Sequence, residues 1–281
     1  MAERYVLITG ASSGIGRACA LDLDARGFHV FATVRRAEDA RSLAAEASPR
    51  LRTLRLDVTD PASIAAAAAA VGEATGSDGL WGLVNNAGIA LAAPLEAMPL
   101  DDFRRQFEVN VFGVMAVTQA FLPLVRRARG RIVLMGSIGG ISVIPFVGAY
   151  CASKFALEAM ADSLRMELGP WGIEVAIVEP GTVATPIWHK GEAEADAILA
   201  RAEPSVAALY RERMERLRRV VAASARRGVD PGVVAGAVRH ALTAKRPKTR
   251  YLIGPAARLR WLLQRLLPDR LRDRILHRLV A

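Results

Sequence analysis

The feature that most constrains the fold is a glycine segment, residues 9–16 (TGASSGIG), which lies between two regular elements. Before it, residues 5–9 form a short apolar run of β-formers, the pattern of a strand buried on both faces of a parallel sheet. After it, apolar residues recur at helical spacing as far as Gly27. Glycines in such a turn let the backbone bend tightly and approach a phosphate at the positive end of the helix. The segment therefore indicates nucleotide binding on an α/β fold.

The alternation of strand and helix continues along the chain. The further strand patterns fall at residues 28–34, 51–58, 80–84, 131–136, 174–179 and 251–253. Alternating elements imply a Rossmann-type, doubly wound parallel sheet. The 281 residues contain no internal repeat and no linker that would divide them. We therefore expect one domain over residues 1–254, followed by an extension over residues 255–281.

A tyrosine and a lysine, Tyr150 and Lys154, stand four residues apart in the segment YCASK. On a helix they project from one face, about one turn apart. A phenol has an ordinary pKa of about 10, and a cation held nearby lowers that value because it favours the phenolate. The pair is a candidate general acid and base for moving a proton on or off an alcohol oxygen. The alternative is a helix with one aromatic side chain and one surface lysine.

The end of the second strand pattern bears on the choice of cofactor. An acid at this position would accept hydrogen bonds from the adenosine ribose and favour NAD. Here the chain has Arg35 and Arg36, and no acid occurs before Glu38. Two guanidinium groups suit a 2′-phosphate, so we favour NADP(H) over NAD(H). The alternative is that both arginines are merely solvated. Asp57 ends the third strand pattern, where α/β sheets place their ligands.

A long helix pattern over residues 101–125 has no charged residue in its second half, residues 109–125. A helix that is apolar all round is buried or faces another subunit. Asn110 is the polar residue nearest the middle of this helix. A buried amide must be hydrogen-bonded, so Asn110 is either a structural plug or a site residue.

The net charge of +10 is concentrated at the end of the chain. Residues 255–281 carry seven arginines and two aspartates, which is half of the excess. Their leucines recur at helical spacing, and Pro268 divides the run in two. Such a basic amphipathic tail suits an anionic membrane surface, the parent domain or a partner subunit. Nucleic acid is the first candidate partner for a basic protein, but we expect none, because the tail has no reading motif and only Trp261 as an aromatic ring.

Two observations bear on the compartment. The uncharged run 132–153 is long enough to span a bilayer, but its four glycines and Pro145 favour a buried strand, a loop and the start of a helix. Cys19 and Cys151 give neither a disulfide framework nor a metal-ligand spacing, so we expect no metal site and a reducing cytosol. The expected location is cytoplasmic, and peripheral to the inner face of a membrane if the tail binds lipid.

Six signals occur in one order along the chain: TGASSGIG, NNAG at residues 85–88, Asn110, Ser137, YCASK and PGTVAT at residues 180–185. Together they resemble the short-chain dehydrogenase/reductase family over residues 5–253. The C-terminal half loosely resembles the retinol and hydroxysteroid dehydrogenase branch. The resemblance implies that Tyr150 exchanges the proton with the substrate oxygen and that Ser137 orients that oxygen. It further implies that Lys154 lowers the Tyr150 pKa and binds the nicotinamide ribose, and that Asn110 holds a helix kink and a water for proton relay.

The resemblance also implies a set of dinucleotide-binding residues. Asp57 and Val58 would meet the adenine, Asn86 would pack near its ribose, and Val183 and Thr185 would hold the carboxamide. The full set is Gly10, Ser12, Ser13, Gly14, Ile15, Gly16, Arg35, Arg36, Asp57, Val58, Asn86, Tyr150, Lys154, Val183 and Thr185. NADP-preferring members often carry a basic residue within the glycine segment, whereas residues 11–13 are Ala, Ser and Ser. The NADP prediction therefore rests on Arg35, supported by Arg36.

The resulting expectation is an NADP(H)-dependent oxidoreductase that interconverts a hydrophobic primary or secondary alcohol and its aldehyde or ketone. Carbonyl reduction is the expected direction, and a homodimer or homotetramer is the expected assembly. The alternatives are an NAD-dependent alcohol dehydrogenase and a non-catalytic dinucleotide sensor on the same fold. Residues 186–230 are expected to cover the substrate. The apolar side chains expected to wall the pocket, or to be ordinary core or dimer contacts, are Ile138, Ile141, Val143, Phe146, Ile187, Trp188 and Ile198.

Overall fold

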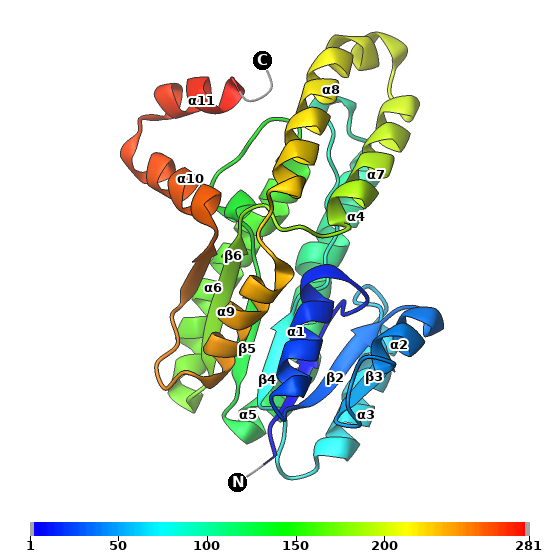
Figure 1. Ribbon diagram of the computed structural model, residues 1–281, viewed down its shortest axis with the longest axis vertical. Helices are drawn as coiled ribbons and strands as arrows, with labels where there is room; N and C mark the ends of the chain where they lie inside the picture. Colours follow the sequence, from blue (N-terminus) through cyan, green and yellow to red (C-terminus); the bar gives the residue numbers. More distant parts are fainter. Residues whose placement is uncertain (1–2, 279–281) are drawn as a thin grey trace.

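The computed structural model of the chain describes residues 3–278, apart from the side chains of residues 187–190 and 192. Within that span seven strands form one parallel sheet (Figure 1). In order across the sheet they are β3 (Leu51–Arg55), β2 (His29–Val34), β1 (Tyr5–Ile8), β4 (Gly82–Asn85), β5 (Arg131–Met135), β6 (Glu174–Pro180) and β7 (Arg250–Ile253). This order confirms the predicted Rossmann-type fold.

The strand order reverses its direction of growth between β1 and β4, which lie side by side at the centre of the sheet. Open α/β sheets bind ligands at such a switch point, beyond the carboxyl ends of the strands. Thr9 connects the carboxyl ends of β1 and β4, because its hydroxyl accepts hydrogen bonds from the N–H groups of Asn86 and Ala87, both at 2.9 Å. The side-chain amide nitrogen of Asn86 donates hydrogen bonds to the Thr9 and Gly10 carbonyls at 2.8 and 3.1 Å. The glycine segment and the NNAG segment therefore form one rigid junction.

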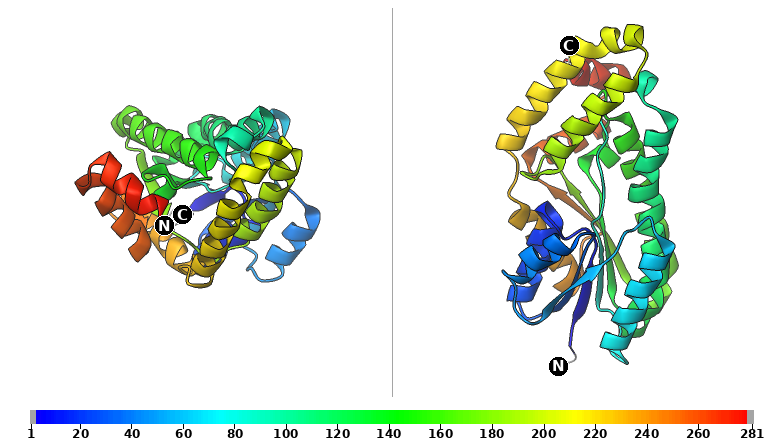
Figure 2. Two further views of the ribbon diagram at one scale, coloured as in Figure 1. Left: turned by 90° about the horizontal axis from the view of Figure 1, so that it is seen from above. Right: turned by 90° about the vertical axis from the view of Figure 1, so that its right-hand side faces the viewer.

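Helices cover both faces of the sheet (Figure 2). Each face has its own apolar core. One face carries α1 (Gly14–Ala25), α2 (Ala37–Ala44) and α9 (Pro231–Thr243). The other face carries α3 (Pro61–Thr75), α5 (Gly113–Ala128) and α6 (Gly148–Leu168). Short 3₁₀ turns, η1 (Leu95–Ala97), η3 (Ile138–Gly140) and η4 (Gly169–Trp171), lie in the connections. The uncharged run 132–153 becomes β5, η3, a loop and the start of α6, as expected.

The long apolar helix is interrupted. α4 (Leu100–Phe107) passes through a π turn, η2 (Glu108–Phe112), into α5. By length and composition, Leu100–Ala128 is the stretch among the described residues that qualifies as a membrane span. Its most apolar window is 44% buried, and α5 packs against the sheet and α3. A helix in the core of a soluble protein meets the same description, so the helix gives little support to a membrane-spanning topology.

A further layer lies beyond the carboxyl ends of the strands (Figure 1). It consists of α7 (Ile187–Arg201) and α8 (Pro204–Arg226), which pack against each other, and of α10 (Pro255–Leu266) and α11 (Asp269–His277) from the tail. The tail is therefore helical and broken at Pro268, as its sequence pattern predicts. These four helices stand around the edge of the sheet where the site residues gather.

A cluster of charged side chains is buried between β6 and α6. The Glu179 carboxyl on β6 is fully buried, and Glu158 on α6 lies beside it. Burial, together with repulsion from Glu158, raises the pKa of Glu179 to about 8. Arg250 on β7 reaches Asp162 at 2.8 Å and Glu158 at 3.2 Å, with Glu179 further away at 3.7 Å. The arginine therefore mainly neutralises the two carboxylates of α6.

Candidate active site and cofactor cleft

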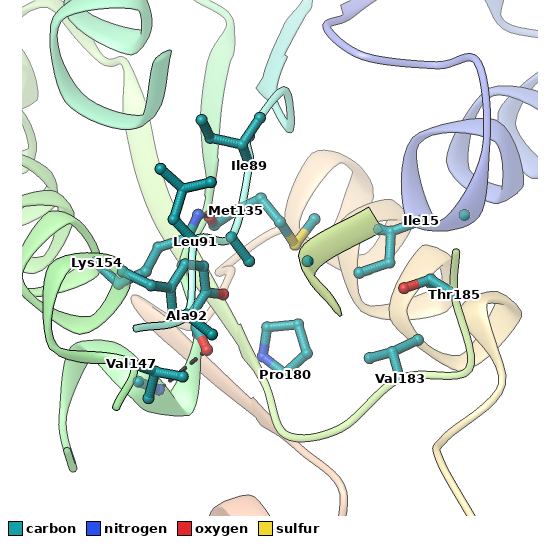
Figure 3. A pocket seen from close by; sticks show the side chains of 18 of the residues that line it. Ile15, Ile89, Leu91, Ala92, Met135, Val147, Lys154, Pro180, Val183 and Thr185 are labelled. Atoms are coloured by element: carbon teal, nitrogen blue, oxygen red, sulfur yellow. Dashed lines mark hydrogen bonds between the residues drawn. The ribbon is translucent and has the colours of Figure 1, made fainter. Parts of the chain in front are cut away.

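A continuous cavity of about 1200 Å³ runs along the carboxyl edge of the sheet. The sequence-predicted residues that line it are Gly10, Ser12, Ser13, Gly14, Ile15, Gly16, Arg35, Asp57, Val58, Asn86, Ser137, Tyr150, Lys154, Val183 and Thr185. Among the described residues, Arg36 and Asn110 belong to the predicted set but lie outside this lining. Figure 3 shows Lys154 on one side of the cavity, with Ile15, Val183 and Thr185 across from it and Pro180 between.

The nucleotide end of the cavity is built from backbone. Gly10 and Gly14 have φ of +67° and +57°, a region that L side chains rarely adopt. A Cβ at Gly16 would collide with the Gly10 carbonyl and the Asn86 amide, so only glycine lets α1 start this close to β1. Ser13, the residue before α1, makes no side-chain cap. The first N–H groups of α1 therefore remain available to an anion, and this cradle fits a pyrophosphate.

The two arginines predicted to bind the cofactor, Arg35 and Arg36, have different surroundings in the structure. Arg35 lines the cavity beside Asp57. Arg36 is exposed and instead binds acids of its own helix, Asp39 at 3.0 Å and Glu38 at 3.3 Å. Asp57 is ionised, because hydrogen bonds from the Thr59 N–H and hydroxyl, at 2.9 and 2.7 Å, hold its pKa below the usual value although burial opposes this. Of the two arginines, Arg35 is therefore the one that lines the cavity.

Ser137, Tyr150 and Lys154 meet at the opposite end. Ser137 follows β5 and its Oγ accepts a hydrogen bond from the Gly139 N–H at 3.0 Å. Burial raises the pKa of Tyr150 to about 12, while a hydrogen bond with Ser137 opposes that rise. Lys154 Nζ donates to the Met135 carbonyl at 2.7 Å and lies 5.8 Å from the Tyr150 ring centroid. Burial lowers the pKa of Lys154 to about 8.

The net shift of the Tyr150 pKa is thus opposite to that expected from the Tyr–Lys spacing. Burial outweighs the Ser137 hydrogen bond and the one charge that lowers the Tyr150 pKa, which is the charge of Arg260 and not that of Lys154. At neutral pH the hydroxyl of Tyr150 is protonated and next to Ser137, which suits it to donate a proton. Burial lowers the pKa of Lys154 while the charge of Glu158 opposes this fall, and Nζ donates its hydrogen bond to a backbone carbonyl.

Asn110 is fully buried in the π turn, behind the cavity. Its amide oxygen accepts from the Ile89 N–H at 2.9 Å, and its amide nitrogen donates to the Ile89 carbonyl and to Ser153 Oγ, both at 3.0 Å. These bonds tie the irregular turn to α6, one residue before Lys154. The helix is irregular here, because the π turn separates α4 from α5. Gly88 brings the two groups together, because its Cβ position is 3.2 Å from Asn110 Oδ1 and 3.8 Å from Lys154 Nζ.

The apolar walls differ from those expected. Ile138 lines the cavity, but Ile141, Val143 and Phe146 are absent from the described lining, and Phe146 packs edge-to-face on Tyr210 with centroids 5.9 Å apart. Ile198 is buried in a separate cluster with Leu91 and Ala93. The side chains of Ile187 and Trp188 lie outside the described residues. The observed walls also come from α8, α10 and α11, through Leu217, Val220, Val221, Leu259, Leu263, Ile275 and Leu276.

The tail helices are therefore part of the cavity. This was missed because the leucine periodicity of residues 255–281 predicts an amphipathic helix but does not say what its apolar side contacts. One polar residue was missed with them. Arg260 on α10 lines the cavity and contacts the Ser142 carbonyl and hydroxyl. In the sequence it is one of seven arginines in the tail, and no local signal distinguishes it from the others.

Comparison with known proteins agrees with this geometry. Residues 4–196 match the family model described as short chain dehydrogenase. The chain belongs to the short-chain dehydrogenase family. It is 41% identical to retinol dehydrogenase 5 of Mus musculus, over 98% of this chain and 88% of that protein. It is 35% identical to an NADPH-dependent 3-dehydrocapnine reductase of Ornithobacterium rhinotracheale, over 98% and 96% of the two chains.

A solved structure confirms the family at the level of the fold. A short-chain dehydrogenase from Streptomyces avermitilis superposes with a TM-score of 0.80 at 32% identity, over 98% of this chain and 95% of that one. As a member of the short-chain dehydrogenase family, the protein is an NAD(P)-dependent oxidoreductase that acts on CH–OH donors.

Proposed function

We propose that the protein is an NADP(H)-dependent oxidoreductase that interconverts a hydrophobic alcohol and its aldehyde or ketone. The observation that carries this is the shared cavity, which has a backbone cradle and Arg35 at one end and Ser137, Tyr150 and Lys154 at the other. A relative named as an NADPH-dependent reductase supports the choice of cofactor. Relatives named as retinol dehydrogenases, and the leucine-lined walls, support an apolar substrate.

In this proposal the dinucleotide lies along the residues predicted for it, with Arg35 at the 2′-phosphate, Asp57 and Val58 at the adenine, and Val183 and Thr185 at the carboxamide. The bound cofactor supplies or accepts the hydride. Tyr150 gives its hydroxyl proton to the carbonyl oxygen during reduction and takes it back during oxidation. Ser137 donates a hydrogen bond that fixes this oxygen. Lys154 holds the nicotinamide ribose, and the buried Asn110 holds the π turn and a water through which Lys154 relays protons.

The direct test is to measure initial rates with NADPH and with NADH on a panel of retinal, steroid ketones and aliphatic ketones and aldehydes. We expect turnover with NADPH, a lower kcat/KM with NADH, and the highest activity on the more apolar carbonyls. Higher kcat/KM with NADH would favour an NAD-dependent alcohol dehydrogenase. NADPH binding, followed by fluorescence, with no turnover of any carbonyl would favour a dinucleotide sensor instead.

The tail supports a second, independent proposal of peripheral membrane contact by a cytoplasmic protein. Leu262 and Leu266 on α10 are 44% and 68% exposed, and arginines stand near them. Flotation with anionic liposomes tests this. We expect the full chain to float and the double variant Leu262→Asp, Leu266→Asp to remain at the bottom of the gradient. Equal flotation of both proteins would contradict the proposal.

We also propose a homodimer or homotetramer, with residues 1–254 as the catalytic domain and residues 255–281 as an extension that completes the substrate pocket. Phe112 at the π turn and Phe155 on α6 are 58% and 40% exposed, which supports an interface on that side of the molecule. Light scattering on a sizing column tests the assembly. A monomer over the micromolar range would contradict it.

A further inference from the structure

Arg260 is unlike the other cavity arginines in its surroundings. Arg104 and Arg105 also line the cavity, and each is paired with a carboxylate, Asp101 at 2.9 Å and Glu194 at 2.6 Å. Arg35 lies beside Asp57. Among the residues that the structure describes, Arg260 has no carboxylate partner.

Arg260 also keeps hydrogen-bonding capacity. Its Nε and Nη2 donate to Ser142, through the hydroxyl at 3.4 Å and through the backbone carbonyl. A guanidinium group carries five N–H donors in a planar fork, so donors remain that Ser142 does not use. Burial lowers the pKa of Arg260, which means that the charge is held at a cost. Arg260 is half-buried, a position where a charge normally has a counter-charge, and no carboxylate among the described residues provides one.

The guanidinium lies at the catalytic end of the cavity. Tyr150 and Cys151 are its titratable neighbours, and its charge opposes the rise in the Tyr150 pKa. The walls beyond it are apolar and come from its own helix, through Leu259 and Leu263, and from α11, through Ile275 and Leu276. A ligand with its head at Arg260 would thus have its reacting carbon near Tyr150 and hydrocarbon along the tail helices.

We propose that Arg260 binds an anionic head group of the substrate. The substrate class is then an amphiphilic alcohol or carbonyl compound, with a carboxylate, sulfonate or phosphate a few atoms from the reacting carbon and a hydrocarbon chain beyond. Such groups accept two parallel hydrogen bonds from a guanidinium fork. The exposed arginines of α10 and α11, among them Arg265, Arg270 and Arg274, would draw anions toward the same mouth of the cavity.

Binding tests the inference without any turnover. Octanoate and octan-1-ol are titrated calorimetrically into the full-length protein, with and without NADP⁺. We expect octanoate to bind about 10-fold or more tightly than octan-1-ol, as the loss of a charge-assisted hydrogen bond implies. Arg260→Met should abolish this difference, and Arg260→Lys should retain part of it. Arg258→Met, on the same helix but outside the cavity lining, is the matched control and should behave as wild type.

Kinetics test the same point on a substrate. The ratio of kcat/KM for 4-oxododecanoate to that for its methyl ester is compared in the same variants. We expect wild type and Arg258→Met to prefer the acid, and Arg260→Met to lower this ratio about 10-fold or more. An equal loss on acid and ester would overturn the inference, because Arg260 would then act on Tyr150 or on the Ser142 loop. Equal affinity of wild type for octanoate and octan-1-ol would overturn it as well.

The inference rests on the proposed function, because only that function makes the anionic ligand a substrate. The anion site and the proposed function would be contradicted by different results. If no carbonyl is reduced but octanoate binding depends on Arg260, the proposed function fails and the anion site stands. If carbonyls are reduced with NADPH but binding shows no dependence on Arg260, the anion site fails and the proposed function stands.

Discussion

The two ends of the cavity are built in different ways. The nucleotide end is made of backbone from the first half of the chain, where Gly10, Gly14 and Gly16 leave peptide groups facing the cavity and Thr9 fixes two strand ends together. The substrate end is made of side chains, and several of them come from α8, α10 and α11. Backbone can recognise a group that is always the same, whereas side chains can change from one protein to another. Under the proposed function, the backbone end would be constrained by the cofactor and the side-chain end by the substrate.

The largest expected effect is on the chemistry at the substrate end. Tyr150→Phe removes the proton donor and should lower kcat/KM for carbonyl reduction by about 10²–10⁴-fold, while the Kd for NADPH, measured by fluorescence, changes far less. Tyr210→Phe is the control, because the Tyr210 hydroxyl contacts Glu96 and does not line the cavity. Wild-type turnover by Tyr150→Phe would remove the basis of the mechanism.

The second largest effect is expected from a substitution at the nucleotide end of the cavity. Gly16→Ala places a methyl group against the Gly10 carbonyl and the Asn86 amide, an overpacking that costs about 1–3 kcal/mol. We expect weaker NADPH binding and a lower Tm. Gly236→Ala on α9 is the matched control, since its Cβ would meet nothing nearer than the Arg239 side chain at 3.9 Å, and it should raise stability slightly. Equal NADPH affinity and equal Tm in the two variants would contradict the importance of the close contact between Gly16 and the Gly10 carbonyl.

Arg35 and Arg36 provide a sharper comparison within the nucleotide end. Arg35→Ala should raise the KM for NADPH about 10-fold, by loss of a charged hydrogen bond, and leave that for NADH nearly unchanged. Arg36→Ala should alter neither, because Arg36 is occupied by Asp39 and Glu38. Steady-state kinetics with both cofactors provide the measurement. Equal changes for NADPH and NADH in Arg35→Ala would contradict the assignment of this residue to the 2′-phosphate.

The smallest expected effect concerns Glu179, near the carboxyl end of β6. Its pKa is about 8 in the folded protein and about 4.5 when unperturbed. Because the pKa of Glu179 is raised in the folded protein, the unfolded state releases this proton at a lower pH than the folded state does. The free energy of unfolding therefore falls as the pH rises from 4.5 to 8. Glu179→Gln should remove part of this loss, by on the order of 1–2 kcal/mol or a few degrees in Tm at pH 9 relative to pH 5. An identical Tm-versus-pH slope in both proteins would contradict it.

The sequence predicts the fold and the nucleotide end better than the substrate end, for a physical reason. Strand periodicity and glycines act through local backbone geometry, so the seven strands and the glycine cradle were predictable. The direction of Arg36 depends on Asp39, only three residues away, and a closer reading of that spacing would have indicated the ion pair. The π turn at Asn110 has no such local signal.

Contacts between distant segments explain the remaining differences. Phe146 packs on Tyr210, and Arg260 meets Ser142, which lies 118 residues away in the chain. Neither contact can be derived from periodicity, because each depends on how a late helix is placed over the sheet. The net direction of the Tyr150 pKa was missed for a related reason, since burial is a property of the assembled cavity and not of the YCASK segment.

The position of α10 and α11 after β7 in the sequence has a consequence for synthesis. A nascent chain that has emerged up to β7 already contains the glycine turn, the catalytic tyrosine and every strand of the sheet. It still lacks one wall of the chamber, together with the arginine that lines it. Synthesis therefore produces the glycine turn and the whole sheet before the two helices that complete the cavity.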